Sequence, residues 1–289
     1  MRILFLGTAE LACPCLEAIH RLTSHELIGV ITQPDKPKGR SLQLAPPPVK
    51  RTAIALGVPV AQPEKIRTAI EEIRAQHPDL IVVVAYGQIL PQSLLDIPGR
   101  GCINVHTSLL PRWRGASPIQ SAILAGDSET GVTLMFMDAQ LDHGDIIRQR
   151  REPIRSADTG ATLHDRLATL GANLLAETLT LADWPRQVQD EAQVTHARKF
   201  TKADGRIDWT KSAVEIDRQV RAFNPWPGAF TDRDGTLLKI WKVELLSGPA
   251  TGVDIVNTGA GALRLLEVQP AGGKRMPFAA YARGHLHQS

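Results

Sequence analysis

The segment DLIVVVAY (residues 79–86) is a continuous apolar run rich in β-branched residues. Such a run is typical of a strand that is buried on both faces of a sheet. Shorter apolar runs at residues 3–7 and 27–32 are followed by segments with helical spacing, of which residues 9–22 and 65–76 are the longest. Strands that alternate with helices predict an α/β domain built on a Rossmann-like parallel sheet.

A short loop after this strand leads to NVHTSLLP (residues 104–111), whose start we interpret as the end of a further strand. Residues i and i+2 of a strand point to the same side, so Asn104 and His106 should face one cavity. Such sheets bind ligands beyond the carboxyl ends of their strands. Further on, LDHGD (residues 141–145) offers the carboxylate of Asp142. An amide, an imidazole and a carboxylate fit an acyl-transfer site; the alternative is a pair of turns whose side chains only bond the backbone.

The second half of the chain has a different pattern. Residues 187–202 are polar and aperiodic, which indicates a linker. Beyond them, a helical pattern at residues 213–222 precedes short apolar runs separated by Gly-rich turns, and such a series predicts a small β-barrel. The predicted organisation is a first domain over 1–186, a linker over 187–205 and a second domain over 206–289.

Composition sets limits on the function. A length of 289 residues allows two domains. The net charge of +3 is too small to establish nucleic-acid binding, so local charge matters more. No apolar run reaches eighteen residues, so no membrane span is expected. Three cysteines without pairing or metal-ligand spacing favour a reducing, cytoplasmic setting without metal. The absence of G-x-G-x-x-G argues against an oxidoreductase with bound NAD or FAD.

The run NVHTSLLPRWRGASPIQSAIL (residues 104–124), followed by LDHGD, resembles the signature of the 10-formyltetrahydrofolate-dependent formyltransferases. In that family the Asn, the His and the Asp are the catalytic residues. The resemblance therefore implies catalytic roles for Asn104, His106 and Asp142, with 10-formyltetrahydrofolate as co-substrate.

Other segments resemble the branch that acts on methionyl-tRNA. They are ILFLGTAELA (3–12), TQPDKPKGRSLQLAPPPVK (32–50), DGRIDW (204–209), RAFNPWPGAF (221–230) and VQPAGGKRMPF (268–278). The resemblance implies an OB-like second domain, initiator methionyl-tRNA as partner and a monomeric enzyme. Two alternatives are a formyltransferase that acts on an amino-sugar or nucleotide amine, and a non-catalytic nucleic-acid-binding protein that kept the barrel.

The resemblance also implies binding residues. In the family, the loop after the buried strand lines the folate pocket with apolar side chains and main-chain groups. The positions carried over for folate are Tyr86, Gly87, Gln88, Ile89, Leu90, Ser108, Leu109 and Pro111. A basic loop and a turn with two cations can hold tRNA phosphates by charge, although a solvated surface is the alternative. The cations carried over are Lys36, Lys38, Arg40, Arg112 and Arg114.

Three features complete the expectations. His143 stands where the family has a small residue or Thr. It either adds a second titratable group to the site or points to solvent, and we expect its imidazole to face solvent. The segment over residues 247–261 is shorter than its counterpart in the family. The turn Asn224-Pro225-Trp226-Pro227 is expected to be structural.

Overall fold

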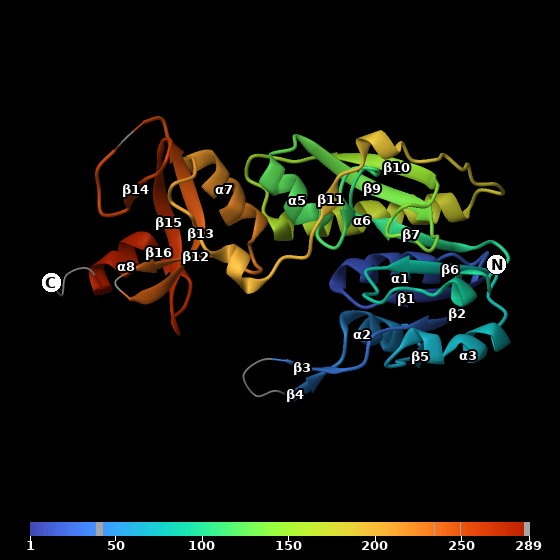
Figure 1. Cartoon of the computed structure of the whole chain (residues 1–289). Coiled ribbons are helices and arrows are strands. Elements are labelled where there is room, and N and C mark those ends of the chain that lie inside the picture. Colours follow the sequence, from blue (N-terminus) through green and yellow to red (C-terminus); the bar gives the residue numbers. More distant parts are fainter. Residues whose placement is uncertain (39–42, 234, 249, 286–289) are drawn as a thin grey trace. The chain divides into compact units, whose positions relative to one another are not determined.

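The computed structural model describes residues 1–38, 43–233, 235–248 and 250–285 (Figure 1). The chain forms two compact units, and neither is continuous in sequence. The first contains Met1–Gly115, Thr130–Pro153 and His164–His196; the second contains Ala116–Glu129, Ile154–Leu163 and Ala197–Ser289. Within the described ranges, no helix is both long enough and apolar enough to cross a membrane.

The described residues of the first unit form a seven-stranded sheet in the order β10-β9-β7-β6-β1-β2-β5 (Figure 1). Its strands are β1 Arg2–Gly7, β2 Glu26–Ile31, β5 Val60–Ala61, β6 Leu80–Val84, β7 Cys102–His106, β9 Glu129–Phe136 and β10 Ile146–Pro153. The strands from β7 to β5 run parallel, and β9 is antiparallel to β7. The predicted parallel-dominated α/β sheet is therefore confirmed.

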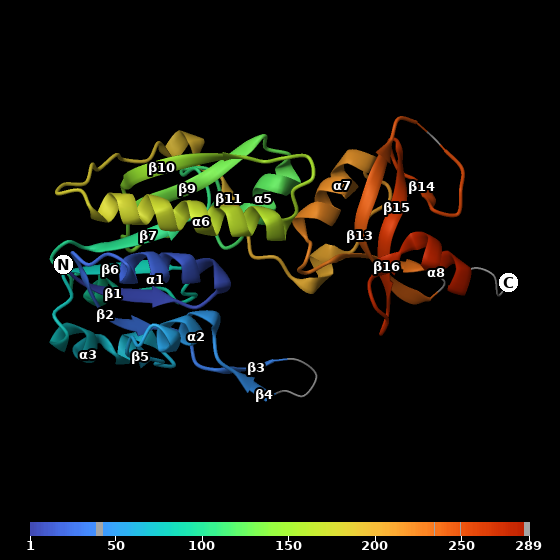
Figure 2. The same ribbon diagram turned by 180° about the vertical axis from the view of Figure 1, so that it is seen from behind.

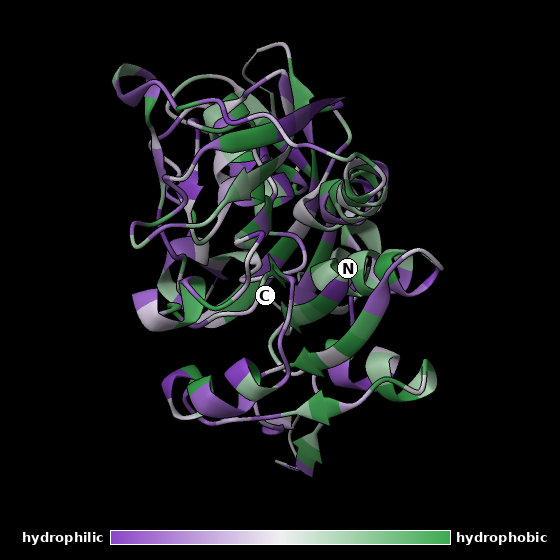
Figure 3. Ribbon diagram, turned by 90° about the vertical axis from the view of Figure 1, so that its right-hand side faces the viewer, coloured by the Kyte–Doolittle hydropathy of each residue, from purple (hydrophilic) through white to green (hydrophobic). Residues whose placement is uncertain are grey.

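Helices cover both faces of this sheet. They are α1 Cys13–His20, α2 Pro48–Ala55, α3 Ile70–Ala75, α4 Gln92–Leu95 and α6 Gly160–Leu179. On one face, Leu4 and Ile81 pack with Ile73 of α3 and Leu94 of α4. On the other, α1 and α6 lie in front of the sheet in Figure 2. All five residues of β6 are buried because both faces are covered, as its apolar run predicts. In Figure 3 the hydrophobic colouring accordingly concentrates in the strands.

Two segments differ from expectation. The helix predicted over residues 65–76 begins as a 3-10 turn, Ile66–Thr68, and continues as α3 after Ala69. The amide of Gln88 accepts the first N–H of that turn, from Ile66, at 2.8 Å. Residues 187–196, expected to be a linker, belong to the first unit and pair with it through Ile146 and Gln187.

The described residues of the second unit form an antiparallel sheet that curls as a half-barrel. Its order is β12-β13-β15-β14, with β16 on β15. The elements are β12 Ala229–Arg233, β13 Thr236–Leu246, β14 Ile255–Asn257, β15 Ala262–Pro270, β16 Met276–Pro277, α5 Pro118–Ala125, α7 Ala213–Ala222 and α8 Phe278–His285. Register shifts between β13 and β15 bend the strands. Ile216 and Val220 of α7 and Phe278 of α8 close the core beneath the sheet.

The Asn-Pro-Trp-Pro turn is structural, as expected. Asn224 is buried, and its carbonyl accepts the N–H of Ala161 at 3.0 Å. Its side-chain amide donates to the carbonyl of Trp241 at 3.4 Å.

Cys13, Cys15 and Cys102 are all buried and free.

Candidate active site

The predicted trio meets at the carboxyl end of β7. Asn104 and His106 lie two residues apart on this strand and therefore point to the same side. The carboxylate of Asp142, on the loop between β9 and β10, lies 3.4 Å from Asn104 Nδ2 and 3.6 Å from His106 Nδ1. The backbone N–H of Gly115 donates to Asp142 Oδ2 at 2.8 Å. One carboxylate thus sits among an amide, an imidazole and a backbone donor.

The hydrogen bonds of His106 define its tautomer. Its Nε2 lies 2.9 Å from the carbonyl oxygen of Trp113, which can only accept, so Nε2 carries a hydrogen. Nδ1 then faces Asp142. The side chain is only 7% exposed and is therefore shielded from bulk water.

Asp142 has an unusual backbone. Its φ is 51°, in the left-handed region that residues with a side chain rarely occupy. Close packing fixes the loop after it, because a Cβ on Gly144 would lie 2.0 Å from the carbonyl oxygen of Phe136. The chain two residues after Asp142 is therefore closely confined by β9.

Gln189, which the sequence did not single out, reaches this loop. It is 4% exposed, and its Nε2 donates to the carbonyls of Asp142 at 2.9 Å and Gly144 at 2.8 Å. Its Oε1 accepts from Arg114 Nε at 3.0 Å and Nη2 at 2.9 Å. A Gln in a polar, aperiodic stretch gives no periodic signal, which is why it was missed.

Arg114 differs from the expected exposed cation. It is 5% exposed, and Nη2 also pairs with Glu191 at 2.7 Å. Its guanidinium is thus engaged by Gln189 and Glu191 inside the protein. Arg112, by contrast, is exposed and stacks over the ring of Trp113 at 4.5 Å. The Arg114 guanidinium lowers the pKa of the Glu191 carboxyl.

His143 is about one-third exposed, and both of its ring nitrogens lie near carboxylates. Its Nδ1 lies 2.6 Å from Asp138 Oδ2, and its Nε2 lies 3.6 Å from Glu191 Oε1. Two carboxylates thus hold the imidazole on either side. The sequence did not predict these neighbours, because Asp138 and Glu191 are distant from each other in sequence and converge only in the fold.

The loop of residues 108–111 is tied to the sheet. Thr133 Oγ1 donates to the carbonyl of Ser108 at 2.7 Å and accepts the N–H of Leu110 at 3.1 Å. Ser108 is fully buried, and its hydroxyl donates to the carbonyl of Arg112 at 2.6 Å. The Ser108 side chain is thus occupied within the protein, whereas Leu109 and Pro111 are partly exposed.

The loop after β6 presents few side chains. The side chains of Tyr86 and Leu90 lie in the core, where burial raises the pKa of Tyr86 to about 12. The Gln88 amide accepts the N–H of Ile66 and donates to the carbonyl of Glu64. Ile89 is 88% exposed, and Gly87 is exposed as well. The side chains of Tyr86, Gln88 and Leu90 are thus engaged within the protein. A 400 Å³ cavity beside this loop is lined by Lys65, Ile66, Arg67, Gln88, Ile89 and Pro91.

The basic segment forms a hairpin. Strand β3, Lys36–Lys38, pairs antiparallel with β4, Gln43–Ala45. Lys36 is exposed, and Arg40 lies outside the described residues. At the base of the hairpin, hydrogen bonds from Gln62 and Lys50 to Asp35 lower the pKa of its carboxyl.

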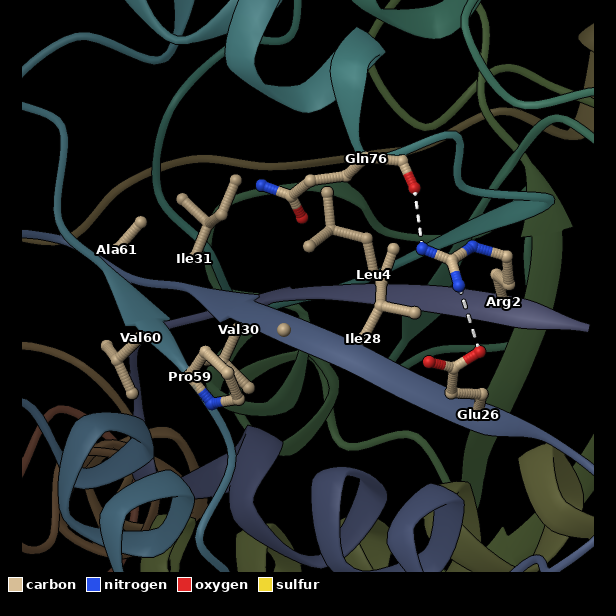
Figure 4. A pocket seen from close by; sticks show the side chains of 11 residues that line it. Arg2, Leu4, Glu26, Ile28, Val30, Ile31, Pro59, Val60, Ala61 and Gln76 are labelled. Carbon is tan, nitrogen blue, oxygen red and sulfur yellow. Dashed lines mark hydrogen bonds and ion pairs between the residues drawn. The ribbon is translucent and has the colours of Figure 1, made fainter.

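Another cavity, of 270 Å³, lies along β1, β2 and β5 (Figure 4). Apolar side chains of β1 and β2, such as Leu4 and Ile28, line it, and Arg2 pairs there with Glu26 at 3.0 Å. None of the three residues of the trio lines this cavity. Among the described residues, no group of His, Cys, Asp and Glu is arranged to hold a metal ion.

Comparison with known proteins gives a consistent result. Residues 1–179 match the family model for formyl transferase, and residues 199–286 match the model for the formyl transferase C-terminal domain. The chain is 50% identical over 301 residues to a methionyl-tRNA formyltransferase of Methylococcus capsulatus, covering 99% of this chain and 97% of that protein. It is 47% identical to the one of Geobacter sulfurreducens, covering 98% and 94%.

Solved structures share the fold at lower identity. A methionyl-tRNA formyltransferase from Clostridium thermocellum has a TM-score of 0.63 at 17% identity, covering 86% of this chain and 95% of that chain. An N-formyltransferase from Helicobacter canadensis, in complex with folinic acid and dTDP-3-aminofucose, has a TM-score of 0.71 at 19% identity, covering 92% and 99%.

Proposed function

The chain belongs to the formyl transferase family, and we propose that it transfers the formyl group of 10-formyltetrahydrofolate to the α-amine of methionyl-initiator tRNA. The product, formylmethionyl-tRNA, serves translation initiation. The observation that carries the proposal is the near full-length similarity, at 46–50% identity, to proteins named methionyl-tRNA formyltransferase. The enzyme is proposed to act as a monomer in the cytoplasm, and a light-scattering mass of twice the chain would contradict the monomer.

Asn104, His106 and Asp142 are proposed as the catalytic residues. The neutral α-amine attacks the formyl carbon, and the carbonyl oxygen becomes an oxyanion. Asn104 has two amide hydrogens, so one can hold Asp142 while the other donates to the oxyanion. One such donor contributes ~3–4 kcal/mol of transition-state stabilisation.

The same reaction requires a proton path. Asp142, 3.6 Å from His106 Nδ1, can share a proton with the imidazole. The proton that leaves the attacking amine passes to this pair, directly or through a water. When the carbon–nitrogen bond to the folate breaks, a proton is returned to the folate nitrogen. The products are the formylated amine and tetrahydrofolate, and together they contain all the atoms of the two substrates.

The remaining predicted residues divide between the two substrates. For folate, we propose the main chain of the loop after β6, together with the partly exposed Leu109 and Pro111 and the exposed Ile89. For tRNA phosphates, we propose Lys36 and Arg112, with Lys38 and Arg40 on sequence grounds. We propose that the second unit binds tRNA, mainly through residues 206–289.

The test supplies the protein with 10-formyltetrahydrofolate and, separately, charged initiator tRNA, uncharged tRNA and an amino-sugar nucleotide. Formylation of the charged tRNA alone is expected, because only it carries a free methionyl amine on a tRNA body. Formylation of the amino-sugar nucleotide without that of the tRNA would make the protein a sugar N-formyltransferase.

A further inference from the structure

The backbone of Asp142 has an unfavourable conformation, although the proposed chemistry requires its carboxylate to be placed accurately. Its φ of 51° is unfavourable for a residue with a side chain. The carboxylate must nevertheless keep its place beside Asn104 and His106. Contacts from outside the loop can hold this backbone in place.

Gln189 provides such contacts on both sides of the turn. One nitrogen, Nε2, donates to the carbonyl of Asp142 at 2.9 Å and to that of Gly144 at 2.8 Å. The side chain is 4% exposed, so water competes little for these bonds. The two carbonyls are fixed relative to each other by a single amide.

Arg114 fixes the orientation of that amide. Its Nε and Nη2 both donate to Gln189 Oε1, at 3.0 and 2.9 Å. A flipped amide would turn its NH₂ group towards the guanidinium and its oxygen towards two carbonyls, so the observed orientation is strongly favoured. Glu191 neutralises the guanidinium at 2.7 Å. The next residue, Gly115, donates its N–H to Asp142 Oδ2 at 2.8 Å, so the same short segment also holds the carboxylate.

We propose that Gln189, oriented by Arg114, is a positioning residue that holds Asp142 in its catalytic conformation. Gln189 does not touch the reacting atoms; it acts through the backbone of Asp142. The activity readout rests on the proposed function, whereas a second readout, amide exchange of the Asp142 loop, does not.

Two substitutions separate the donor from the acceptor. Gln189→Met keeps the length of the side chain and loses both functions, and Gln189→Glu keeps the acceptor for Arg114 but loses the N–H donors. Both should lower kcat by about 10- to 100-fold, because small misplacement of a catalytic group has large effects on rate. KM for the tRNA and for the folate should change less than about threefold, since neither substrate is held by Gln189. Gln193→Met is the matched control: Gln193 lies in the same segment, and its amide bonds the exposed Asp190 at 2.7 Å.

A double-mutant cycle tests whether the effect runs through Asp142. In single-turnover assays, Gln189→Met should add little to the defect of Asp142→Asn, because the first change acts by displacing the second residue. If the rate defects of the two single variants multiply in the double variant, the proposal is wrong. A Gln189→Glu enzyme with the wild-type kcat would also overturn it, since the N–H donors would then be dispensable.

Hydrogen–deuterium exchange gives the activity-independent readout. Exchange of the amides of Asp142, His143 and Gly144 should accelerate in Gln189→Met and not in Gln193→Met. Unchanged exchange would refute the positioning role of Gln189, whatever reaction the protein catalyses. If the wild type fails to formylate methionyl-tRNA but the exchange effect is present, the proposed function is wrong and the positioning role of Gln189 is retained.

Discussion

His106 can exchange a proton at only one ring nitrogen, because its Nε2 donates to the carbonyl of Trp113 at 2.9 Å. Removal of the imidazole in His106→Ala should therefore abolish proton exchange with Asp142, and Asn104→Ala should remove an oxyanion donor. Each change is expected to lower the single-turnover rate by about 10²-fold or more. Asp142→Asn should be impaired as well. His164→Ala, which removes an imidazole paired with Asp165 on α6, is the control. Near-normal rates in all three site variants would place the chemistry elsewhere.

Single residues were predictable from the sequence where local geometry suffices. The strand rule places Asn104 and His106 on one side without further information. Asp142 was assigned through resemblance, since its position depends on a loop about forty residues away. Gln189, Arg114 and His143 required the fold, because their partners come from segments far apart in sequence and no periodic pattern marks them.

Lys36 of β3 is exposed, and it follows Asp35, which Lys50 holds by an ion pair at 2.9 Å. If Lys36 contacts a tRNA phosphate, Lys36→Ala should raise KM for tRNA and lower the slope of log K against log salt by ~0.7–0.9. Folate binding should be unchanged. Arg21→Ala is the charge-matched control, because Arg21 lies between α1 and the start of β2, whereas β3 follows the end of β2, and Arg21 is 68% exposed. An unaltered salt slope would show that Lys36 does not contact a tRNA phosphate.

The short helix Lys202–Gly205 depends on an ionised side chain. Asp204 accepts from Arg198 and from the backbone and hydroxyl of Thr201, and these bonds hold its pKa well below the usual carboxyl range. Because the folded pKa is lowered, the stabilisation is present above pH ~3.9 and is lost as the pH falls through the lower, folded pKa.

Asp204→Asn should accordingly destabilise the protein at neutral pH by about 1 kcal/mol, as for a lost helix cap. The melting temperature should fall by roughly 2–4 °C. The difference from wild type should shrink in strong acid, where both side chains are neutral. Thermal melts across pH check this, with the exposed Asp183→Asn as control. A difference that stays constant with pH would mean that the charge of Asp204 is irrelevant.

Elements with a strong pattern were predicted within about two residues, as β1, β2 and β6 show. Their patterns are strong because β6, nearly all of β1 and the second half of β2 are buried. β14, β16 and α8 were missed. The two strands have only three and two residues, and their pairing with β15 depends on contacts that short segments do not encode.

At the scale of the whole molecule, the two compact units interleave in sequence. Helix α5 lies between β7 and β9 in the chain but belongs to the second unit, where it packs against α7. A guanidinium nitrogen of Arg218 on α7 lies 3.4 Å from the carbonyl of Ala125 on α5. The contiguous domains predicted from the sequence could not include this exchange, because an eight-residue helix carries no signal for its distant partner.

The interleaving predicts the outcome of cutting the chain in the loop after Lys199. A chain that ends there lacks α7, so the apolar side chains that α5 buries, among them Ile119 and Ile123, lose packing partners. Exposure of two such side chains costs about 3–6 kcal/mol. The truncated chain should therefore melt well below the full-length protein and bind a hydrophobic dye. The matched control is the full-length protein nicked by a protease at the same loop: it has the same break but keeps α7, so it should melt close to the intact chain. If the truncated and nicked proteins melt alike, α5 does not depend on α7, and the chain divides into contiguous domains after all.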